Sequence, residues 1–261
     1  MSYIGGKARG SQHILEVLNH PRFDGMAYLE PCVGMGHVLR RVTNKRSYTV
    51  SDANPLVVRL LEAIQSGEAL PAITRERYAQ LHVEYDAMLA RGETSLLKGN
   101  ADSLETAVAA FQYSFNGREF GGYVNTYTRR NGKVDDIPRS RANYYAVLNS
   151  SPSFRDATLS TCDYRAHAPS QCLVYCDPPY QGTTGYKGTP QFDHAAFWQT
   201  VREWSRDNTV LVSEYVAPPD FACIAHRPKQ SCLAGGHRQT PRVERLFVHE
   251  TLLPLFTDDS A

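Results

Sequence analysis

A short strand followed by a glycine turn near the N-terminus places the strongest constraint on the fold. Residues 26–30 predict a strand, residues 31–36 (Pro-Cys-Val-Gly-Met-Gly) a turn, and residues 37–42 a helical run. A second predicted strand, residues 48–52, ends in an acid, Asp52, soon after the glycines. This order forms the ligand-binding corner of a doubly wound α/β sheet, and an acid at that position accepts hydrogen bonds from ribose hydroxyls. The pattern favours a nucleoside-containing cofactor over a turn and an acid that serve only the fold.

A second feature is the apolar run Leu173–Cys176, which stops abruptly at Asp177-Pro178-Pro179-Tyr180. The run predicts a buried strand followed by a rigid loop, because each proline fixes its backbone and donates no hydrogen bond. The prolyl carbonyls are therefore free to accept from a ligand. A carboxylate, a free carbonyl and an aromatic ring suit a planar group with an exocyclic NH2, such as a nucleobase. The alternative interpretation is an ordinary proline turn with a surface aspartate.

The composition is that of an ordinary globular protein. The 261 residues are 42% hydrophobic and 21% charged, with a formal net charge of +1, which fits one domain or one domain with an insertion. The six cysteines form no CxxC pair, so we expect no metal and reduced, mostly buried thiols in a cytoplasmic protein. No apolar segment approaches the ~20 residues of a membrane helix, and we expect no membrane partner.

Between these two features lies a segment with helical spacing and then a predicted β-hairpin. Apolar positions predict a helix over residues 55–66 and more helices between residues 74 and 110, and Asn131-Gly132 is a strong hairpin signal. Elsewhere the sequence predicts a short helix over residues 141–148, helix caps at Ser11 and Asp193, and core packing for Trp198 and Trp204. The predicted hairpin carries cations at its tip (Arg129, Arg130, Lys133) and Tyr123, Asn125 and Tyr127 on one face of its first strand. Arginine contacts phosphate or guanine, asparagine reads adenine and aromatic rings stack on bases. We therefore predict contact with double-stranded DNA, and the alternative is a surface hairpin with a charged tip.

Six short motifs occur along the chain in a specific order. They are Tyr3 to Lys7 (Tyr-x-Gly-Gly-Lys), Glu30 to Gly36, Ser51 to Asn54, Asn116 to Arg118, Asp163-Tyr164 and Asp177 to Tyr180. This ordered set resembles the Dam-type DNA adenine-N6 methyltransferases, and the resemblance runs from Tyr3 to about Phe247. It implies a Rossmann-like methyltransferase sheet with an inserted helical and β-hairpin DNA-recognition subdomain. The catalytic domain would comprise residues 1–54 and 151–261, and the insertion residues 55–150.

The resemblance also implies roles for individual residues in methyl transfer from S-adenosylmethionine to N6 of a flipped-out adenine. The loop Asp177, Pro178, Pro179 and Tyr180 would hold that adenine. Glu30, Gly34 and Gly36 would line the cofactor, Asp52 would bind its ribose, Asp163 and Tyr164 its adenine, and Tyr3 and Lys7 its methionine end. Asn116 and Arg118 would join the hairpin residues as DNA contacts.

The sequence departs from the family pattern at two places. Cys32 stands where the family usually has phenylalanine, and Arg118 to Gly122 replaces the usual Arg-Tyr-Asn run, so a GATC target is not implied. Three alternatives stay open: methylation of cytosine N4, methylation of adenine in RNA, and a catalytically silent DNA-binding protein with the same fold. The oligomeric state is open between a monomer and a weak dimer.

Overall fold

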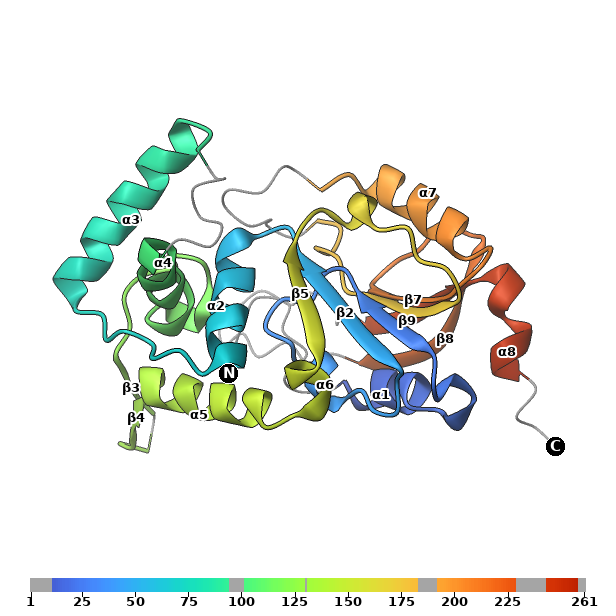
Figure 1. The fold of residues 1–261 in the computed structure, drawn as a ribbon, viewed down its shortest axis with the longest axis horizontal. Helices are drawn as coiled ribbons and strands as arrows, with labels where there is room; N and C mark the ends of the chain where they lie inside the picture. Colours follow the sequence, from blue (N-terminus) through green and yellow to red (C-terminus); the bar gives the residue numbers. More distant parts are fainter. Residues whose placement is uncertain (1–10, 94–100, 130, 183–191, 229–242, 258–261) are drawn as a thin grey trace.

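A computed structural model describes residues 11–93, 101–129, 131–182, 192–228 and 243–257 (Figure 1). Its centre is a seven-stranded sheet in the order β5-β2-β1-β6-β7-β9-β8. The strands are β1 (Ala27–Glu30), β2 (Ser47–Asp52), β5 (Ala157–Thr161), β6 (Cys172–Cys176), β7 (Thr209–Glu214), β8 (Phe221–Pro228) and β9 (Val243–His249). Strands β5, β2, β1, β6 and β7 run parallel, and β9 runs antiparallel to both of its neighbours.

The strand order places a topological switch point between β1 and β6. From β1 the chain builds β2 and β5 on one side, and it later returns to pair β6 with the other side of β1. In open α/β sheets, ligands bind outside the carboxyl ends of the strands at such a point. The predicted Rossmann-like α/β fold is confirmed, and it directs attention to the residues that follow β1, β2 and β6.

Both faces of the sheet are covered, as expected for parallel strands. Along β6, Leu173 and Tyr175 belong to one buried cluster, whereas Val174 and Cys176 belong to a second cluster on the opposite face. The described helices are α1 (Gln12–Leu18), α2 (Pro55–Ser66), α3 (Arg75–Ala90), α4 (Ala101–Gln112), α5 (Ile137–Asn149), α6 (Pro152–Arg155), α7 (His194–Trp204) and α8 (Pro254–Thr257). The predicted packing role of the two tryptophans is confirmed, since Trp198 and Trp204 of α7 lie in the second cluster.

The chain between β2 and β5 forms helices α2 to α6 and the small hairpin β3 (Thr126–Thr128) and β4 (Val134–Asp136). Helices α2 to α5 gather at the β5 side of the sheet, and the hairpin lies beside α5 (Figure 1). Helix α2 ends at Gly67 in the left-handed conformation (φ 74°), as its sequence predicts. No described strand of this stretch joins the large sheet. The division at residues 55 and 150 stays a prediction, because α2 also packs against β2 and β5.

Several local predictions differ from the structure. The helical run predicted over residues 37–42 is a single 3-10 turn, η2 (Leu39–Arg41). The carbonyls with which a longer helix would continue accept from side chains instead: those of Leu39 and Arg40 from the hydroxyls of Ser153 and Ser151, and that of Arg41 from Asn19. Helix α5 begins at Ile137 and not at Arg141, since Asp136 caps it by accepting from the Arg139 N–H at 2.8 Å. Strand β8 was not predicted.

The thiol prediction is only partly correct. The five described cysteines are free, but Cys176 alone among them is buried, and Cys223 is exposed. No described helix is long and apolar enough to cross a membrane. Among the described residues, no group of three or more His, Cys, Asp or Glu side chains is arranged to hold a metal ion.

Candidate active site

Carboxylates collect at the carboxyl edge of the parallel strands. Glu30 ends β1, Asp52 ends β2, Glu214 ends β7, and Asp177 directly follows β6. Because β1 pairs in parallel with both β2 and β6, the ends of these strands lie side by side at this edge. Burial raises the pKa of the Cys32 thiol, and the nearby Cys176, Asp52, Asp177 and Glu30 raise it further. The Cys32 thiol therefore stays protonated, which argues against a nucleophilic cysteine. The sheet brings together Glu30, Asp52 and Asp177, as the sequence predicted.

The glycine turn after β1 is fastened to the end of β2. Gly34 (φ 50°) and Gly36 (φ 66°) both adopt the left-handed conformation that favours glycine. The Gly34 N–H donates to Oδ2 of Asp52 at 3.0 Å, and the Asn54 N–H donates to Oδ1 at 2.9 Å. A Cβ on Gly36 would lie 3.1 Å from Cδ1 of Leu148, so α5 packs directly on the turn. Burial outweighs the two hydrogen bonds and raises the pKa of Asp52 to about 6.

A buried serine connects three of the loops at this edge. The Ser51 hydroxyl lies 3.4 Å from the Pro31 carbonyl, to which it donates, and 2.7 Å from Nε2 of His167. Nε2 of His167 either donates to the Ser51 hydroxyl or accepts from it, depending on the tautomer of the ring. The chain of bonds joins the loop after β5, the end of β2 and the turn after β1. Sequence reasoning missed His167, since its only signal is a position four residues after Asp163.

Asp163 and Tyr164 differ in their solvent exposure and in the residues that they contact. Asp163 lies at the edge, where it caps a 3-10 turn through the Arg165 N–H (2.9 Å) and accepts from Nε of Arg165 at 2.7 Å. Tyr164 is only 5% exposed, and its ring packs edge-on against Phe197 at 5.3 Å and Trp204 at 6.5 Å. The ring thus belongs to the core beneath α7. The predicted adenine contacts of both residues stay predictions.

The loop after β6 is held by residues from two other strands. Tyr180 is 8% exposed, and its hydroxyl donates to Oε1 of Glu244 in β9 at 3.1 Å. Its ring meets Tyr215 edge-on at 4.6 Å. The next backbone N–H, of Gln181, donates to Oε2 of Glu214 at 3.0 Å. Pro178 is buried and Asp177 half-buried, so the loop has a defined position with a carboxylate at its start. Sequence reasoning missed Glu214 and Glu244.

The Asn116-Gly117-Arg118 motif forms a tight turn, η4 (Phe115–Gly117), that closes on itself. The Phe115 N–H donates to the Gly122 carbonyl at 2.7 Å, and Asn116 adopts φ 54°. Phe115, Asn116 and Arg118 are exposed, whereas the rest of the turn is mostly buried. The structure therefore presents the two predicted residues and one unpredicted aromatic side chain, Phe115, on the surface. An aromatic residue beside a predicted DNA contact was the available signal.

The hairpin is confirmed, but its contact face differs from the prediction. Tyr127 (52% exposed) lies in β3, whereas Tyr123 precedes the strand and packs on Tyr113 at 6.1 Å, with its hydroxyl donating to the Ile73 carbonyl. Strand β3 is too short to carry both tyrosines on one face. Asn125 and Lys133 are exposed, and Nε of Arg129 is bonded to Asp135 at 2.5 Å. Tyr3, Lys7 and Arg130 lie outside the described residues.

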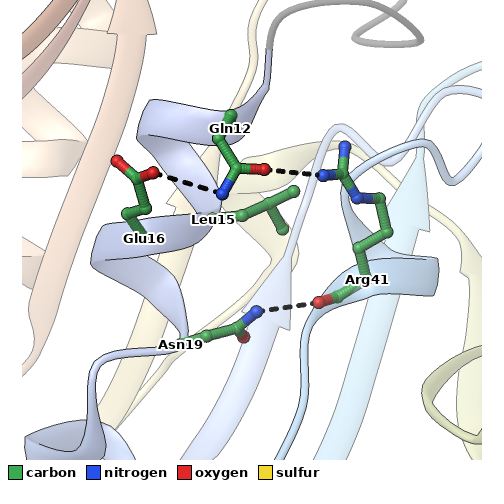
Figure 2. A pocket seen from close by; sticks show the side chains of 5 residues that line it. All are labelled: Gln12, Leu15, Glu16, Asn19 and Arg41. Carbon is green, nitrogen blue, oxygen red and sulfur yellow. Dashed lines mark hydrogen bonds between the residues drawn. The ribbon is translucent and has the colours of Figure 1, made fainter.

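A surface pocket of about 500 Å³ lies between α1 and η2 (Figure 2). Its lining residues are Gln12, Leu15, Glu16, Asn19 and Arg41. The polar groups bond mainly to one another: Gln12 joins Glu16 to the Arg41 guanidinium, and Asn19 donates to the Arg41 carbonyl at 2.9 Å. Ser11, predicted as the cap of α1, instead accepts from Arg41 at 2.9 Å and makes no side-chain cap. The pocket belongs to the scaffold.

Comparison with protein families decides the classification. The model of the D12 class N6 adenine-specific DNA methyltransferases matches residues 3–229. The chain belongs to this family. Membership makes the protein a methyltransferase and implies S-adenosylmethionine as the methyl donor. The predicted resemblance to adenine methyltransferases is thus confirmed.

Two solved structures share remote likeness with this D12-class chain. The rRNA methyltransferase aviRa from Streptomyces viridochromogenes is 13% identical, with 98% of this chain and 91% of that chain covered and a TM-score of 0.40. A putative methyltransferase, yhhF from Escherichia coli, is 10% identical, with 94% and 89% covered and a TM-score of 0.35. No curated protein matches the chain. These likenesses are too remote to bear on the substrate.

Proposed function

We propose that this D12-class protein transfers a methyl group from S-adenosylmethionine to N6 of an adenine flipped out of double-stranded DNA. The observation that carries the proposal is the position of Asp177. It follows β6, which pairs with β1 at the switch point of the sheet, and so lies at the same strand edge as Glu30 and Asp52. An acceptor for an exocyclic amine thus stands beside the predicted cofactor residues.

The residues at the strand ends fit a cationic cofactor. Glu30 is 2% exposed, accepts from the Tyr28 hydroxyl at 2.8 Å and adds to the negative charge of Asp52 and Asp177. Gly34 and Gly36 give the turn after β1 a left-handed backbone, the kind of conformation that lets a loop approach a ligand closely. A buried carboxylate cluster favours the sulfonium and ammonium groups of S-adenosylmethionine, and in this proposal Asp52 binds its ribose. The bound cofactor supplies an electrophilic methyl group.

In the proposed reaction the loop after β6 makes the adenine amine reactive. The N6 lone pair is delocalised into the ring, so the amine is a poor nucleophile. Hydrogen bonds from its NH2 to the Asp177 carboxylate and the Pro178 carbonyl would favour a pyramidal nitrogen whose lone pair faces the methyl group. The nitrogen–carbon bond forms as the carbon–sulfur bond breaks, and N6 releases one proton to water. Positioning and charge placement carry this step, and base flipping costs a few kcal/mol of unstacking.

The proposed DNA face combines the η4 turn and the hairpin. Arg118, Lys133 and Asn125 are exposed, and the rings of Phe115 and Tyr127 are half-exposed. Cations contact phosphates or base edges, and aromatic rings wedge between or stack on bases. A ring inserted into the duplex would fill the space that the flipped adenine leaves. The exposed aromatic and cationic side chains in one inserted segment favour nucleic acid over a small-molecule substrate.

The test is transfer of tritiated methyl from S-adenosylmethionine to duplex DNA, followed by nucleoside analysis. We expect N6-methyl-2′-deoxyadenosine and loss of at least about 100-fold in kcat for Asp177→Ala, because the amine loses its carboxylate acceptor. Asp207→Ala, an exposed aspartate in the turn before β7, serves as the matched control and should retain wild-type rates. Label in N4-methylcytosine, label only in RNA, or undiminished transfer by Asp177→Ala would each overturn the proposal. Duplex binding without any transfer would indicate a silent DNA-binding protein.

A further inference from the structure

The turn of residues 115–122, here called the recognition turn, carries a buried glutamate, Glu119, that contacts the loop after β2. Glu119 directly follows Arg118 but is 8% exposed, in contrast to the exposed arginine. Its Oε2 accepts from Nδ2 of Asn54 at 2.9 Å. Its Oε1 accepts a very short hydrogen bond from the Tyr85 hydroxyl of α3. Glu119 therefore joins the inserted segment to the residue two positions after Asp52.

Asn54 connects Glu119 to Asp52, because it forms hydrogen bonds to both residues. Its backbone N–H holds Oδ1 of Asp52 at 2.9 Å, and its side-chain oxygen accepts from the Leu56 N–H at 3.0 Å to cap α2. With the oxygen committed to Leu56, the amide nitrogen has to face Glu119, so the orientation of the Asn54 amide is determined by both neighbours. Rotation of Asn54 would disturb the cap of α2 and the bond to Asp52 together.

The position of Glu119 is itself fixed by the packing of Phe120. Phe120 adopts φ 45°, a strained conformation for a bulky residue, and its buried ring lies against Tyr85 at 5.2 Å and stacks on His82 at 4.7 Å. At Gly121 a Cβ would lie 2.7 Å from the Cβ of Arg118, so the turn leaves no room for another residue there. The backbone on either side of Glu119 is thereby held, and the carboxylate keeps its direction.

We propose that Glu119 is a positioning residue for the cofactor: through Asn54 it orients the Asp52 carboxylate, so that a residue of the recognition turn sets the affinity for S-adenosylmethionine. This inference rests on the proposed function, because it assumes that Asp52 binds the cofactor ribose. Glu119 contacts neither the cofactor nor the methyl group in this scheme. Its effect falls on cofactor binding and spares the chemical step.

The hydrogen-bond polarity of the pair allows a sharp test. Asn54→Asp keeps the oxygen that caps α2 but removes the donor to Glu119 and sets two carboxylates against each other. Combining it with Glu119→Gln reverses the polarity: the new glutamine amide donates to the carboxylate introduced at position 54, and its oxygen accepts from Tyr85. The total charge of the double variant equals that of the wild type. The double variant restores the link that the single variant breaks.

The experiment measures KM for S-adenosylmethionine and kcat in DNA methylation, with the Kd of the methyl donor in the absence of DNA. We expect Asn54→Asp to raise KM and Kd about tenfold, the effect of one lost charge-assisted hydrogen bond, with kcat within about twofold. Asn54→Asp/Glu119→Gln should return KM to within about twofold of the wild type. Tyr85→Phe, which removes another partner of Glu119, should lower Tm but leave KM unchanged.

Three outcomes would overturn the proposal. They are an unchanged KM in Asn54→Asp, failure of the double variant to recover, and an equal rise of KM in Tyr85→Phe, which would indicate general loosening of the insertion. Each is distinct from failure of the proposed function. In that case the wild-type protein itself would methylate no DNA, while the Kd measurements would still report on the Glu119–Asn54 link.

Discussion

The backbone N–H of Gly34 donates to the Asp52 carboxylate at 3.0 Å, which locks the glycine turn after β1 to the end of β2. The bond stabilises the ionised carboxylate, as does the bond from Asn54. Burial acts in the opposite direction and is stronger, so the pKa of Asp52 rises to about 6. The predicted ribose ligand is therefore half protonated near pH 6, within the range in which the protein can be assayed.

This shift predicts a pH-dependent affinity for S-adenosylmethionine. Asp52 is ionised above its pKa and protonated below it, and an ionised carboxylate is the stronger acceptor for ribose hydroxyls. We expect Kd to be constant above about pH 7 and to rise, by at most tenfold per unit, as the pH falls through about 6. Calorimetric titration of the protein with the methyl donor from about pH 5 to about pH 8 measures this.

Asp52→Asn provides the control for that profile. The amide cannot ionise. The Kd of this variant for S-adenosylmethionine should therefore be higher than that of the wild type at neutral pH, and it should not change with pH over the same range. A flat wild-type profile, or an unchanged slope in Asp52→Asn, would show that another group controls cofactor binding.

His167 gives a second prediction, because its Nε2 and the Ser51 hydroxyl connect three loops at the strand ends. His167→Ala removes the hydrogen-bond partner of Ser51 and should raise KM for S-adenosylmethionine about tenfold, with a smaller change in kcat. His167→Gln places an amide donor near the position of Nε2 and should recover most of the affinity. His226→Ala, at an exposed site on β8, is the matched control. Equal KM values for the Ala and Gln variants would contradict a role of the hydrogen bond.

Local sequence patterns predicted the elements that they specify directly. The strand, glycine turn and acid between residues 26 and 52 gave the sheet corner, and Asp193 caps α7 as expected by accepting from the Ala196 N–H at 3.0 Å. Asn131-Gly132 correctly located the hairpin. In each of these cases the controlling interactions lie within a few residues, so propensity and spacing suffice.

Contacts between distant residues could not be predicted in this way. The hydrogen bond between Tyr180 and Glu244 joins residues 64 positions apart in the sequence, and the one between Asn54 and Glu119 joins residues 65 positions apart. Such pairs depend on strand register and on how the inserted helices pack, which no local pattern encodes. Strand β8 was missed for a related reason. It lies at the edge of the sheet and pairs only with β9, so its extended conformation depends on hydrogen bonds to that strand.

Arg141 leads to a stability prediction, because it is a guanidinium buried among carbonyls. It is 5% exposed and donates to the carbonyl oxygens of Phe111 and Gln112, and to that of Ser114 at 2.7 Å. The residue caps the C-terminal end of α4 and holds the start of the recognition turn. Burial lowers the pKa of Arg141, but the group stays charged.

Arg141→Leu should therefore lower the free energy of unfolding by about 2–4 kcal/mol, since three buried carbonyls lose their donor. At about 2–4 °C per kcal/mol for a chain of this size, we expect Tm to fall by roughly 5–15 °C in a thermal melt. Arg155→Leu, at the exposed C-terminal end of α6, should change Tm little. If Tm of Arg141→Leu fell by less than about 2 °C, water would have replaced the guanidinium as donor to the three carbonyls.

The last prediction compares two arginines on the proposed DNA face. Arg118 is exposed and makes no ion pair with a described carboxylate, whereas Arg129 is bonded to Asp135 at 2.5 Å. Binding DNA through Arg129 would have to compete with that carboxylate, so most of the electrostatic attraction should come from Arg118.

We therefore expect Arg118→Ala to weaken duplex binding by about 1–3 kcal/mol and to reduce the slope of log K against log salt by about one. Arg129→Ala should have a clearly smaller effect, and Asp135→Asn should tighten binding by releasing Arg129. Fluorescence anisotropy with one labelled duplex at several salt concentrations measures all three. If Arg129→Ala proved as damaging as Arg118→Ala, the Arg129–Asp135 pair would have to open on DNA, and the hairpin tip would carry the main contact.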